Sequence, residues 1–376
     1  MRATVCRVSA TLRTALPPIY ANLLSRELDR PAIAETRATC DDCEMCDKGT
    51  MPPEAAAIYF LRDTKCCTYH PALPNYLVGS ILRDRSPDMA DGQRRIRERI
   101  ASRIGVGPLR LAPSAKYLLL YRASSVNAFG RSASLRCPYL TDDARCSIWR
   151  HRESICSTFF CKFEGGQPSV LFWRALKEYL SYVEIALSRW AVRTVAKDVV
   201  PFTSEETELT LEELEDRPPT DDVYAKAWGS WLGREEELYL ACESRVRNLS
   251  PAQFASIVDD TATGRERLDE LRSRYAATTS WKVPERLALH KKLRRLPVAS
   301  GIAVTTPYNR YDSMLIDKDL FGVLERFRHE ETVEEIRRRL AEEEGIELTE
   351  ELLLHLSRHL VLAEPPRPEA PMNTDG

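Results

Sequence analysis

The spacing of hydrophobic residues predicts a chain built mainly from helices. Residues 91–104 read DGQRRIRERIASRI, in which Ile96, Ile100 and Ile104 recur at every fourth position. This spacing is typical of an amphipathic helix, here with a basic outer face. A longer helix is predicted at about 169–196, with an apolar face that consists of Phe172, Leu176, Leu180 and Val183.

Strands are predicted in two places. The apolar stretches 116–123 and 133–140 read as a pair of strands with Gly130 in the turn between them. Residues 301–316, GIAVTTPYNRYDSMLI, alternate in polarity and turn near Asn309, which predicts a β-hairpin.

Helices are also expected in the remaining chain, at 221–278, 317–328, 331–345 and 348–364. Thr332 and Glu335 have the spacing of a capping box at the start of the third of these helices, and Gly345 is expected to end it. Residues 283–296 form a basic amphipathic segment.

The predicted fold class is mainly α with small β-hairpins (α+β). An acidic stretch followed by RPPTDD marks the clearest boundary. We expect an N-terminal helical segment at 1–35, a loop-rich cysteine-cluster domain at 36–200, an acidic linker at 201–220, a helical region at 221–297, a winged-helix-like domain at 298–364 and a disordered tail at 365–376.

Composition and charge narrow the classes of function. The chain has 376 residues and a formal net charge of −2, so its overall charge does not indicate a nucleic-acid partner. No apolar run has the length of a membrane span, and the N-terminus lacks the apolar core of a signal peptide. A cytoplasmic protein that does not enter a membrane is expected, and thiols stay reduced in that compartment.

Cysteines give the strongest chemical signal. Eleven are present, of which Cys6 and Cys242 stand apart and are expected to be ordinary buried or surface residues. In a reducing compartment, a dense set of cysteines favours metal binding over disulfides. The expected metal ligands are Cys40, Cys43, Cys46, Cys66, Cys67, Cys137, Cys146, Cys156 and Cys161.

Thiolates are soft ligands that suit zinc or an iron–sulfur cluster. Cys40, Cys43 and Cys46 begin like a bacterial ferredoxin run, but position 50 is Thr, so further ligands must come from distant segments. Nine thiols exceed one four-ligand site. The pattern leaves open whether there are two centres, or one centre with additional supporting or redox-active thiols, and whether the cofactor is a 4Fe-4S cluster or zinc.

Two pairs of histidines are weaker candidates. His70 and His151 lie beside cysteines and are able to complete a site, although such residues more often support one. His355 and His359 are four residues apart on a predicted helix and are expected to form a solvated face.

The segment 137–161 resembles the signature of the YkgJ-type cysteine-cluster proteins, which are described as zinc- or iron-chelating. The resemblance covers about 36–165, and Glu153 and Ser157 stand where the family has Pro and Arg. It implies a thiolate metal site, and it is shared more distantly with flagellin lysine methylases. The matching residues are Cys137, Pro138, Leu140, Cys146, Ile148, Trp149, Arg152, Cys156, Phe159 and Cys161.

Residues 300–363 resemble PqqD-type domains, the peptide-recognition modules of peptide-modifying enzymes, although the linker RHEE lacks the family's Asp-Gly. The resemblance implies that an extended peptide pairs with a strand of the wing. DNA is disfavoured, because Arg358 shares its predicted helix with Glu350 and Glu351.

Two functions follow. In the first, a metal centre modifies a peptide or protein substrate held by the C-terminal domain. In the second, the protein is a non-catalytic zinc-stabilised scaffold, or a metal-handling or electron-transfer protein. The sequence contains no P-loop, dinucleotide-binding or nucleophile-elbow motif that would indicate one class of enzyme. It therefore leaves open whether the protein is an enzyme.

Overall fold

The computed structural model describes residues 12, 16–24, 43, 45–46, 59–199, 209–328 and 330–365, without the side chains of 125–126. These residues form two compact units. The N-terminal unit holds the described residues up to Phe159 together with Trp173–Leu271, and the C-terminal unit holds Phe160–Phe172 and the described residues from Arg272 onward. The expected tail and most of the expected segment 1–35 lie outside the described residues.

This division differs from the six expected segments. Residues on both sides of the acidic linker 201–220 belong to the N-terminal unit, and the second division falls at Leu271–Arg272 rather than at 297–298. The unit boundaries at Phe172–Trp173 and Leu271–Arg272 fall within two long helices, α6 (Gly166–Val195) and α11 (Ala262–Ser280).

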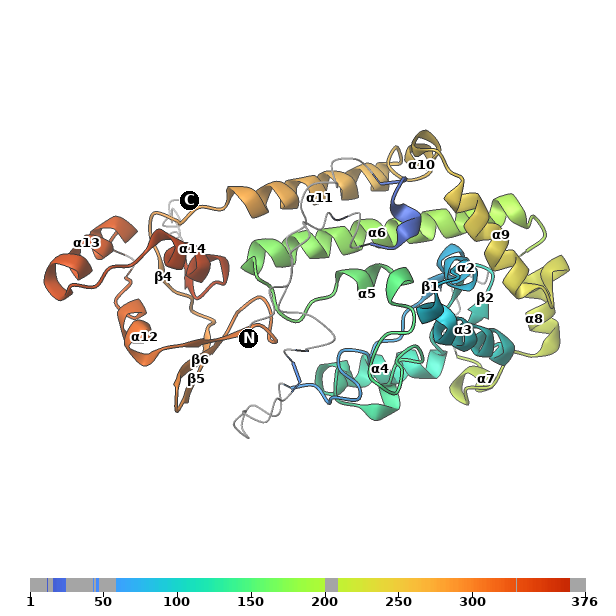
Figure 1. Cartoon of the computed structure of the whole chain (residues 1–376), viewed down its shortest axis with the longest axis horizontal. Coiled ribbons are helices and arrows are strands. Elements are labelled where there is room, and N and C mark those ends of the chain that lie inside the picture. Colours follow the sequence, from blue (N-terminus) through green and yellow to red (C-terminus); the bar gives the residue numbers. More distant parts are fainter. Residues whose placement is uncertain are drawn as a thin grey trace, which may run out of the picture. The chain divides into compact units, whose positions relative to one another are not determined.

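Helices dominate the N-terminal unit, as the fold class predicted, and its strands form one small antiparallel sheet in the order β1-β3-β2 (Figure 1). The elements are η1 (Pro18–Tyr20), β1 (Leu73–Pro74), α2 (Asn75–Arg83), η4 (Pro87–Met89), α3 (Ala90–Ser102), β2 (Val106–Gly107), β3 (Arg110–Leu111), α4 (Ala115–Ala128), η5 (Ala133–Leu135), η6 (Trp149–His151), α5 (Ser154–Thr158), α7 (Leu211–Leu214), α8 (Asp221–Trp228), η7 (Gly229–Trp231), α9 (Glu235–Arg247) and α10 (Pro251–Ile257).

The helices with the clearest apolar spacing are confirmed. In α3, Ile96 and Ile100 are buried, while Arg94 and Arg97 are exposed. In α6, the predicted apolar face is buried throughout, at Phe172, Leu176, Leu180 and Val183.

The predicted strands at 116–123 and 133–140 are wrong. The first lies inside helix α4, which begins after Ser114, whose hydroxyl accepts a hydrogen bond from the N–H of Tyr117. Tyr117 and Tyr121 stack on each other at the i, i+4 spacing of a helix, with ring centroids 5.6 Å apart. The second stretch forms the short helix η5 and a loop.

A close crossing joins α2 to α9. Gly79 lies at the crossing, where a Cβ atom would come within 2.2 Å of the Tyr239 carbonyl oxygen. Next to it, the fully buried carboxylate of Glu243 accepts hydrogen bonds from Arg83, at 2.6 Å, and from Arg247. The absence of a side chain at Gly79 therefore allows the two backbones to approach and bring Glu243 to Arg83.

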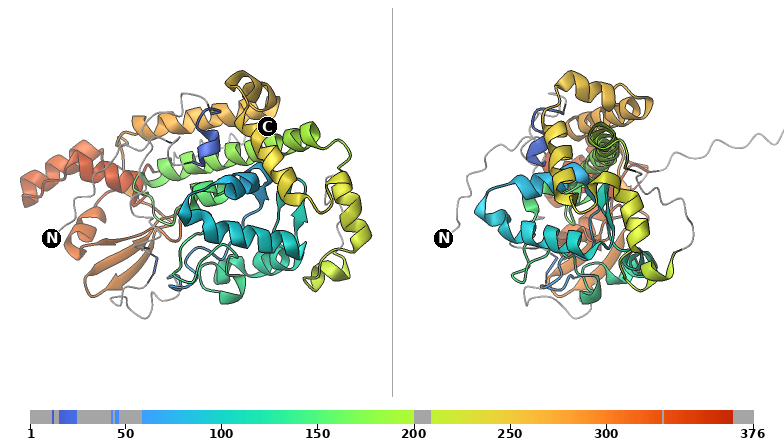
Figure 2. Two further views of the ribbon diagram at one scale, coloured as in Figure 1. Left: turned by 45° about the vertical axis from the view of Figure 1, so that its right-hand side comes forward. Right: turned by 90° about the vertical axis from the view of Figure 1, so that its right-hand side faces the viewer.

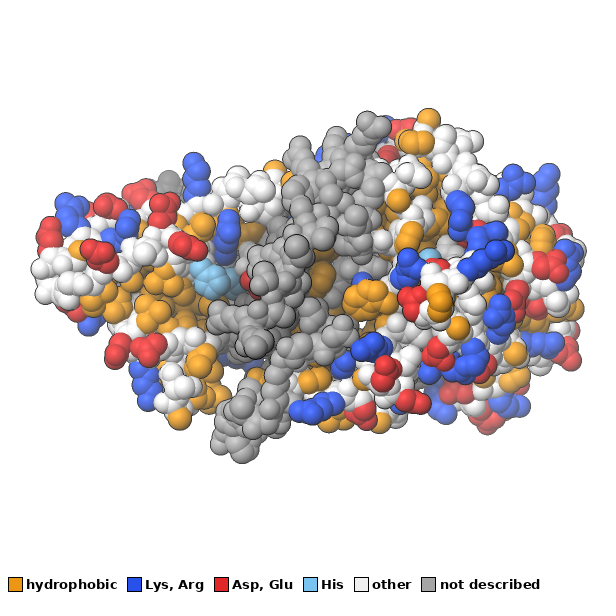
Figure 3. All heavy atoms as spheres, in the orientation of Figure 1, with side chains coloured by type: hydrophobic (Ala, Val, Ile, Leu, Met, Phe, Trp, Pro, Cys, Tyr) orange, Lys and Arg blue, Asp and Glu red, His pale blue; other side chains and the backbone are white. Residues whose placement is uncertain are grey.

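On the face shown in Figure 3, Lys and Arg side chains of the described residues are interspersed with Asp and Glu side chains. No described helix is long and apolar enough to cross a membrane.

Beyond the end of α11, the described residues of the C-terminal unit form two small antiparallel sheets and three helices (Figures 1 and 2). One sheet has the order β5-β6-β7 and the other pairs β4 with β8. The elements are β4 (Ala288–Leu289), β5 (Arg294–Val298), β6 (Gly301–Thr305), β7 (Ser313–Ile316), α12 (Lys318–Leu324), α13 (Val333–Glu344), α14 (Glu350–Arg358) and β8 (Leu362–Ala363).

The hairpin and the helix ends of this unit are confirmed. Strands β6 and β7 pair antiparallel across the turn that contains Asn309. Thr332 and Glu335 form the capping box of α13, and Gly345 ends that helix in the left-handed conformation.

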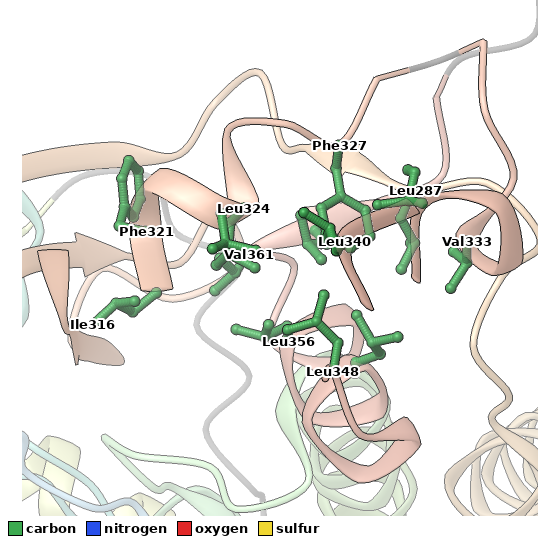
Figure 4. Close-up of a cluster of buried hydrophobic side chains, with 14 of the residues drawn as sticks. Leu287, Ile316, Phe321, Leu324, Phe327, Val333, Leu340, Leu348, Leu356 and Val361 are labelled. Carbon is green, nitrogen blue, oxygen red and sulfur yellow. The ribbon is translucent and has the colours of Figure 1, made fainter. Parts of the chain in front are cut away.

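One apolar core holds the C-terminal unit together (Figure 4). Helix residues such as Leu324, Leu340 and Leu356 pack with Ile316 of the sheet. Leu287 and Leu293 also belong to this core, although both precede the expected start of the domain at 298. The reason is that β4 and β5 complete the two sheets on which the helices pack.

The crossing of α2 and α9 yields a stability prediction. Gly79→Ala places a methyl group against the backbone of Tyr239, which belongs to a helix and cannot move alone, so we expect a loss of about 1–3 kcal/mol of unfolding free energy. Thermal or urea unfolding measures it. Gly107→Ala is the matched control, since its nearest neighbour would lie 3.8 Å away. Equal stabilities of the two variants would contradict the prediction.

Candidate metal centre

A turn anchored to Gly130 positions Cys66 and Cys67. The carbonyl oxygen of Gly130 accepts hydrogen bonds from the N–H of Leu61 and the hydroxyl of Thr64, and its own N–H donates to the hydroxyl of Thr68. Gly130 has a φ of 74°, which favours glycine. The predicted turn at Gly130 is present, but it holds the cysteine segment rather than two strands.

A second loop brings Cys137 and Cys146 to this turn. The N–H of Cys137 donates to the carbonyl oxygen of Cys67 at 2.8 Å. The loop then closes on itself, since Leu140 and Cys146 form a β-bridge and the N–H of Ser147 donates to the carbonyl oxygen of Tyr139. Cysteines from two distant parts of the sequence therefore lie in one region.

The electrostatics of the thiols show which of them are neighbours. A hydrogen bond with the Cys67 thiol and burial raise the pKa of Cys66 well above its usual value, so these adjacent side chains meet. Burial raises the pKa of Cys137 to about 12, and Cys146 and Cys66 add to the shift. Burial, Glu153 and then Cys137 raise the pKa of Cys156 well above its usual value. We call Cys66, Cys67, Cys137, Cys146 and Cys156 the thiol cluster.

Cys43 and Cys46 form a second thiol pair. Burial and then Cys43, through its charge and a hydrogen bond, raise the pKa of Cys46 to about 12, while Lys65 and Arg62 lower it. A tight turn joins the two residues, because the N–H of Cys46 donates to the Cys43 carbonyl oxygen at 3.1 Å.

The remaining expected ligands lie elsewhere. Cys40 lies outside the described residues. Cys161 is buried in the C-terminal unit, where its carbonyl oxygen accepts a hydrogen bond from the side chain of Asn309. Cys242 is buried on α9, as an ordinary core residue. All the described cysteines are free thiols.

The thiols share a region without converging on one point. Within the part of the chain that the structure describes, no group of three or more His, Cys, Asp or Glu side chains is close enough to hold a metal ion. Most of the possible ligand atoms in the thiol cluster are sulfur atoms, which are soft ligands. It therefore fits zinc or iron better than magnesium or calcium.

Two buried carboxyl groups accept hydrogen bonds from the start of helix α5, which carries Cys156. Glu153 accepts hydrogen bonds from the N–H groups of Ile155 and Cys156, and Glu184 of α6 accepts from the N–H and hydroxyl of Ser154. Burial raises the pKa of both groups, and for Glu184 the charge of Glu153 adds to it.

Neither glutamate stands out in the sequence as a candidate for this role. The available signal for Glu184 is its charge at a position of the apolar face of α6, four residues after Leu180. Glu153 appeared only as a departure from the family pattern.

The candidate histidines have other partners. Nε2 of His70 lies 2.9 Å from the Arg136 carbonyl oxygen, so it carries a proton and donates, and the ring stacks on Tyr117. Nε2 of His151 lies 2.9 Å from a carboxylate oxygen of Asp84. Nδ1 of His151 is buried without a hydrogen-bond partner among the described residues, which keeps it as a possible ligand.

The expected solvated face at His355 and His359 is half wrong. His355 is exposed, but His359 is fully buried. Its two ring nitrogens lie 2.9 Å from the His355 carbonyl oxygen and 3.0 Å from that of Phe163. His359 is therefore a core residue that links α14 to the segment 160–172 of the same unit.

Comparisons with protein-family models, with curated proteins and with solved structures find no match to this chain. The resemblances to YkgJ-type and PqqD-type domains therefore stay predictions from the motifs.

The environment of His70 predicts acid sensitivity. Burial lowers the pKa of His70 to about 4, whereas an unfolded histidine titrates near 6.5. As the pH falls from about 6.5 to about 4, the unfolded chain binds a proton that the folded chain does not. The free energy of unfolding therefore decreases across this window, by up to about 3 kcal/mol.

Chemical unfolding at a series of pH values measures this effect. His70→Gln should flatten the decrease, while His355→Gln, at an exposed position, should leave it unchanged. A wild-type slope retained in His70→Gln would show that other groups cause the acid sensitivity.

Proposed function

We propose that the N-terminal unit binds a metal ion or an iron–sulfur cluster through cysteine thiolates. The observation that carries this proposal is the meeting of the Cys66–Cys67 turn with the loop of Cys137 and Cys146, which the hydrogen bond from the Cys137 N–H to the Cys67 carbonyl oxygen and the bridge between Leu140 and Cys146 hold together. The effect of Cys137 on the pKa of Cys156 adds this thiol to the group. Buried thiols that raise one another's pKa values are unfavourable as anions. A bound cation removes this conflict, because coordination deprotonates a thiol.

The surroundings of the thiol cluster supply positive charge and order. Arg152 lowers the pKa of Cys66, opposing its net rise, and donates a hydrogen bond to the carbonyl oxygen of Cys156 at 3.0 Å. Its guanidinium also lies 3.4 Å from the centre of the Trp149 ring. Arg152 therefore supports a site that carries several negative sulfurs.

Cys43 and Cys46 are proposed to hold a second position, either as further ligands with Cys40 or as a supporting thiol pair. When bound, an iron–sulfur cluster supplies one-electron chemistry and zinc supplies a cross-link that stabilises the loops. Modification of a peptide or protein substrate, and a non-catalytic scaffold or electron-transfer role, both remain compatible with this arrangement.

Peptide binding by the C-terminal unit is the second candidate function. Strand β5 pairs with β6 along its length, so β6 has no free edge. The outer edge of β5 is exposed and carries Arg294 and Arg295. Pro297 has no N–H to offer there, so the usable stretch is short. We propose that an acidic extended peptide pairs with β5.

Metal analysis tests the first proposal. Protein purified without oxygen should contain a metal. An iron–sulfur cluster would add sulfide and a brown colour that absorbs at about 400 nm, whereas zinc would leave the protein colourless. Cys67→Ala and Cys156→Ala should each lower the metal content, because each removes a proposed ligand. Cys242→Ala, in a buried cysteine outside the thiol cluster, is the control. Unchanged metal content in both cluster variants would refute the proposal.

Charge reversal tests the second proposal in the full chain. An extended peptide of alternating Glu and Val should slow amide exchange in β5. Arg294→Glu should weaken its binding by about fivefold, as expected for the loss of an exposed ion pair. Lys318→Glu makes the same charge change on α12 and serves as the control. Equal weakening in both variants, or no protection of β5, would rule out pairing at this edge.

A further inference from the structure

We propose that Glu153 and Glu184 are positioning residues that hold Cys156 as a metal ligand. This inference rests on the proposed metal binding and names two residues outside the expected ligand set that support it. Helix α5 carries Cys156 and has only five residues.

The two carboxyl groups bind the first three N–H groups of α5. Glu184 accepts from the N–H of Ser154 at 2.6 Å, and Glu153 accepts from those of Ile155 and Cys156 at 2.6 and 2.9 Å. These N–H groups have no partner within the helix itself. A helix this short does not hold its shape alone, so its geometry depends on the two carboxyl groups.

The backbone of Cys156 is held on both sides. Its N–H donates to Glu153, and its carbonyl oxygen accepts from Arg152. Glu153 and Arg152 therefore fix the backbone from which the Cys156 thiol extends.

Other helices of this protein are capped in a less costly way. Helices α7, α10 and α13 use the hydroxyl of Thr210, Ser250 or Thr332 in a capping box at the surface. In α5 the caps are two acidic groups with exposures of 3% for Glu153 and 7% for Glu184. Burying two neighbouring carboxyl groups is unfavourable, so a simple need to cap a helix does not explain them.

Ser154 and Ser181 connect the pair to the long helix. The Ser154 hydroxyl lies 2.8 Å from a Glu184 oxygen, 3.3 Å from a Glu153 oxygen and 2.8 Å from the Ser181 hydroxyl. Both Glu184 and Ser181 belong to α6, so this network fixes α5 against a long helix with a buried apolar face. Cys156 is thereby placed relative to the core and not only to its own loop.

Cobalt(II) is a suitable probe, because each thiolate that binds it adds to its sulfur-to-metal charge-transfer absorbance. Purified full-length chain is titrated with cobalt alone, and both affinity and absorbance per bound cobalt are recorded. The variants are Cys156→Ser, Glu153→Ala, Glu153→Gln, Glu184→Leu and the double variant Glu153→Ala/Cys156→Ser. Ser250→Ala removes a cap from α10, which carries no cysteine, and is the matched control.

We expect Glu153→Ala and Glu184→Leu to weaken cobalt binding by about 10- to 100-fold and to lower the absorbance per cobalt as Cys156→Ser does. The double variant should lose nothing further, because both changes act on the same ligand. Glu153→Gln should regain part of the absorbance, since its amide oxygen still accepts from the Cys156 N–H. Ser250→Ala should bind cobalt like the wild type.

The outcomes separate this inference from the proposed function. If the wild type binds no cobalt, the metal proposal and this inference fail together. If Cys156→Ser loses absorbance while Glu153→Ala matches the wild type, metal binding stands and the positioning role is wrong. Equal losses in Glu153→Ala and Ser250→Ala would attribute the effect to general destabilisation, which also overturns the positioning role.

Discussion

The thiol cluster of the N-terminal unit depends on one backbone hydrogen bond, which runs from the N–H of Cys137 to the carbonyl oxygen of Cys67. It joins two loops that have little regular structure of their own. Gly130 holds the first loop in the conformation that presents Cys66 and Cys67, and the bridge between Leu140 and Cys146 closes the second. The thiol cluster exists because these few backbone contacts bring the loops together.

The thiol cluster brings together buried thiol groups whose charged, deprotonated forms are unfavourable. Burial raises the pKa values of Cys137 and Cys156, and two buried carboxyl groups, those of Glu153 and Glu184, cap the helix that carries Cys156. Arg152 offsets part of this burden at Cys66. A protein gains no stability from such a group of acids by itself, and the proposed metal is the simplest cation that would balance them.

The C-terminal unit follows a different principle, since an apolar core rather than polar contacts holds it together. Leu287 and Leu293, which directly precede strands β4 and β5, join that core from positions before the expected start of the domain. Strand β5 pairs with β6, so β6 is the central strand of its sheet, and the edge that we propose for a peptide is the exposed outer edge of β5. The position of a domain boundary thus decides which edge of the sheet is available for binding.

Patterns in the sequence were sufficient to predict those elements that form through contacts between residues close together in the chain. The spacing of Ile96 and Ile100, the apolar face of α6 and the capping box at Thr332 involve residues within a few positions of one another, and all are confirmed. The hairpin of β6 and β7 belongs to the same class, because its turn lies between the paired strands.

Tertiary structure alone decided features that depend on distant partners. Residues 116–123 are apolar enough for a strand, but they form a helix whose Tyr117 stacks on His70 and donates a hydrogen bond to the Thr68 carbonyl oxygen, both far away in the sequence. His359 has the spacing of a surface residue and is buried because Phe163 approaches it. The sequence by itself singled out the cysteines, since their density is a property of composition. Which of them meet, and the role of Glu153 and Glu184 beside them, followed only from the folded chain, because those contacts join segments that no sequence spacing relates.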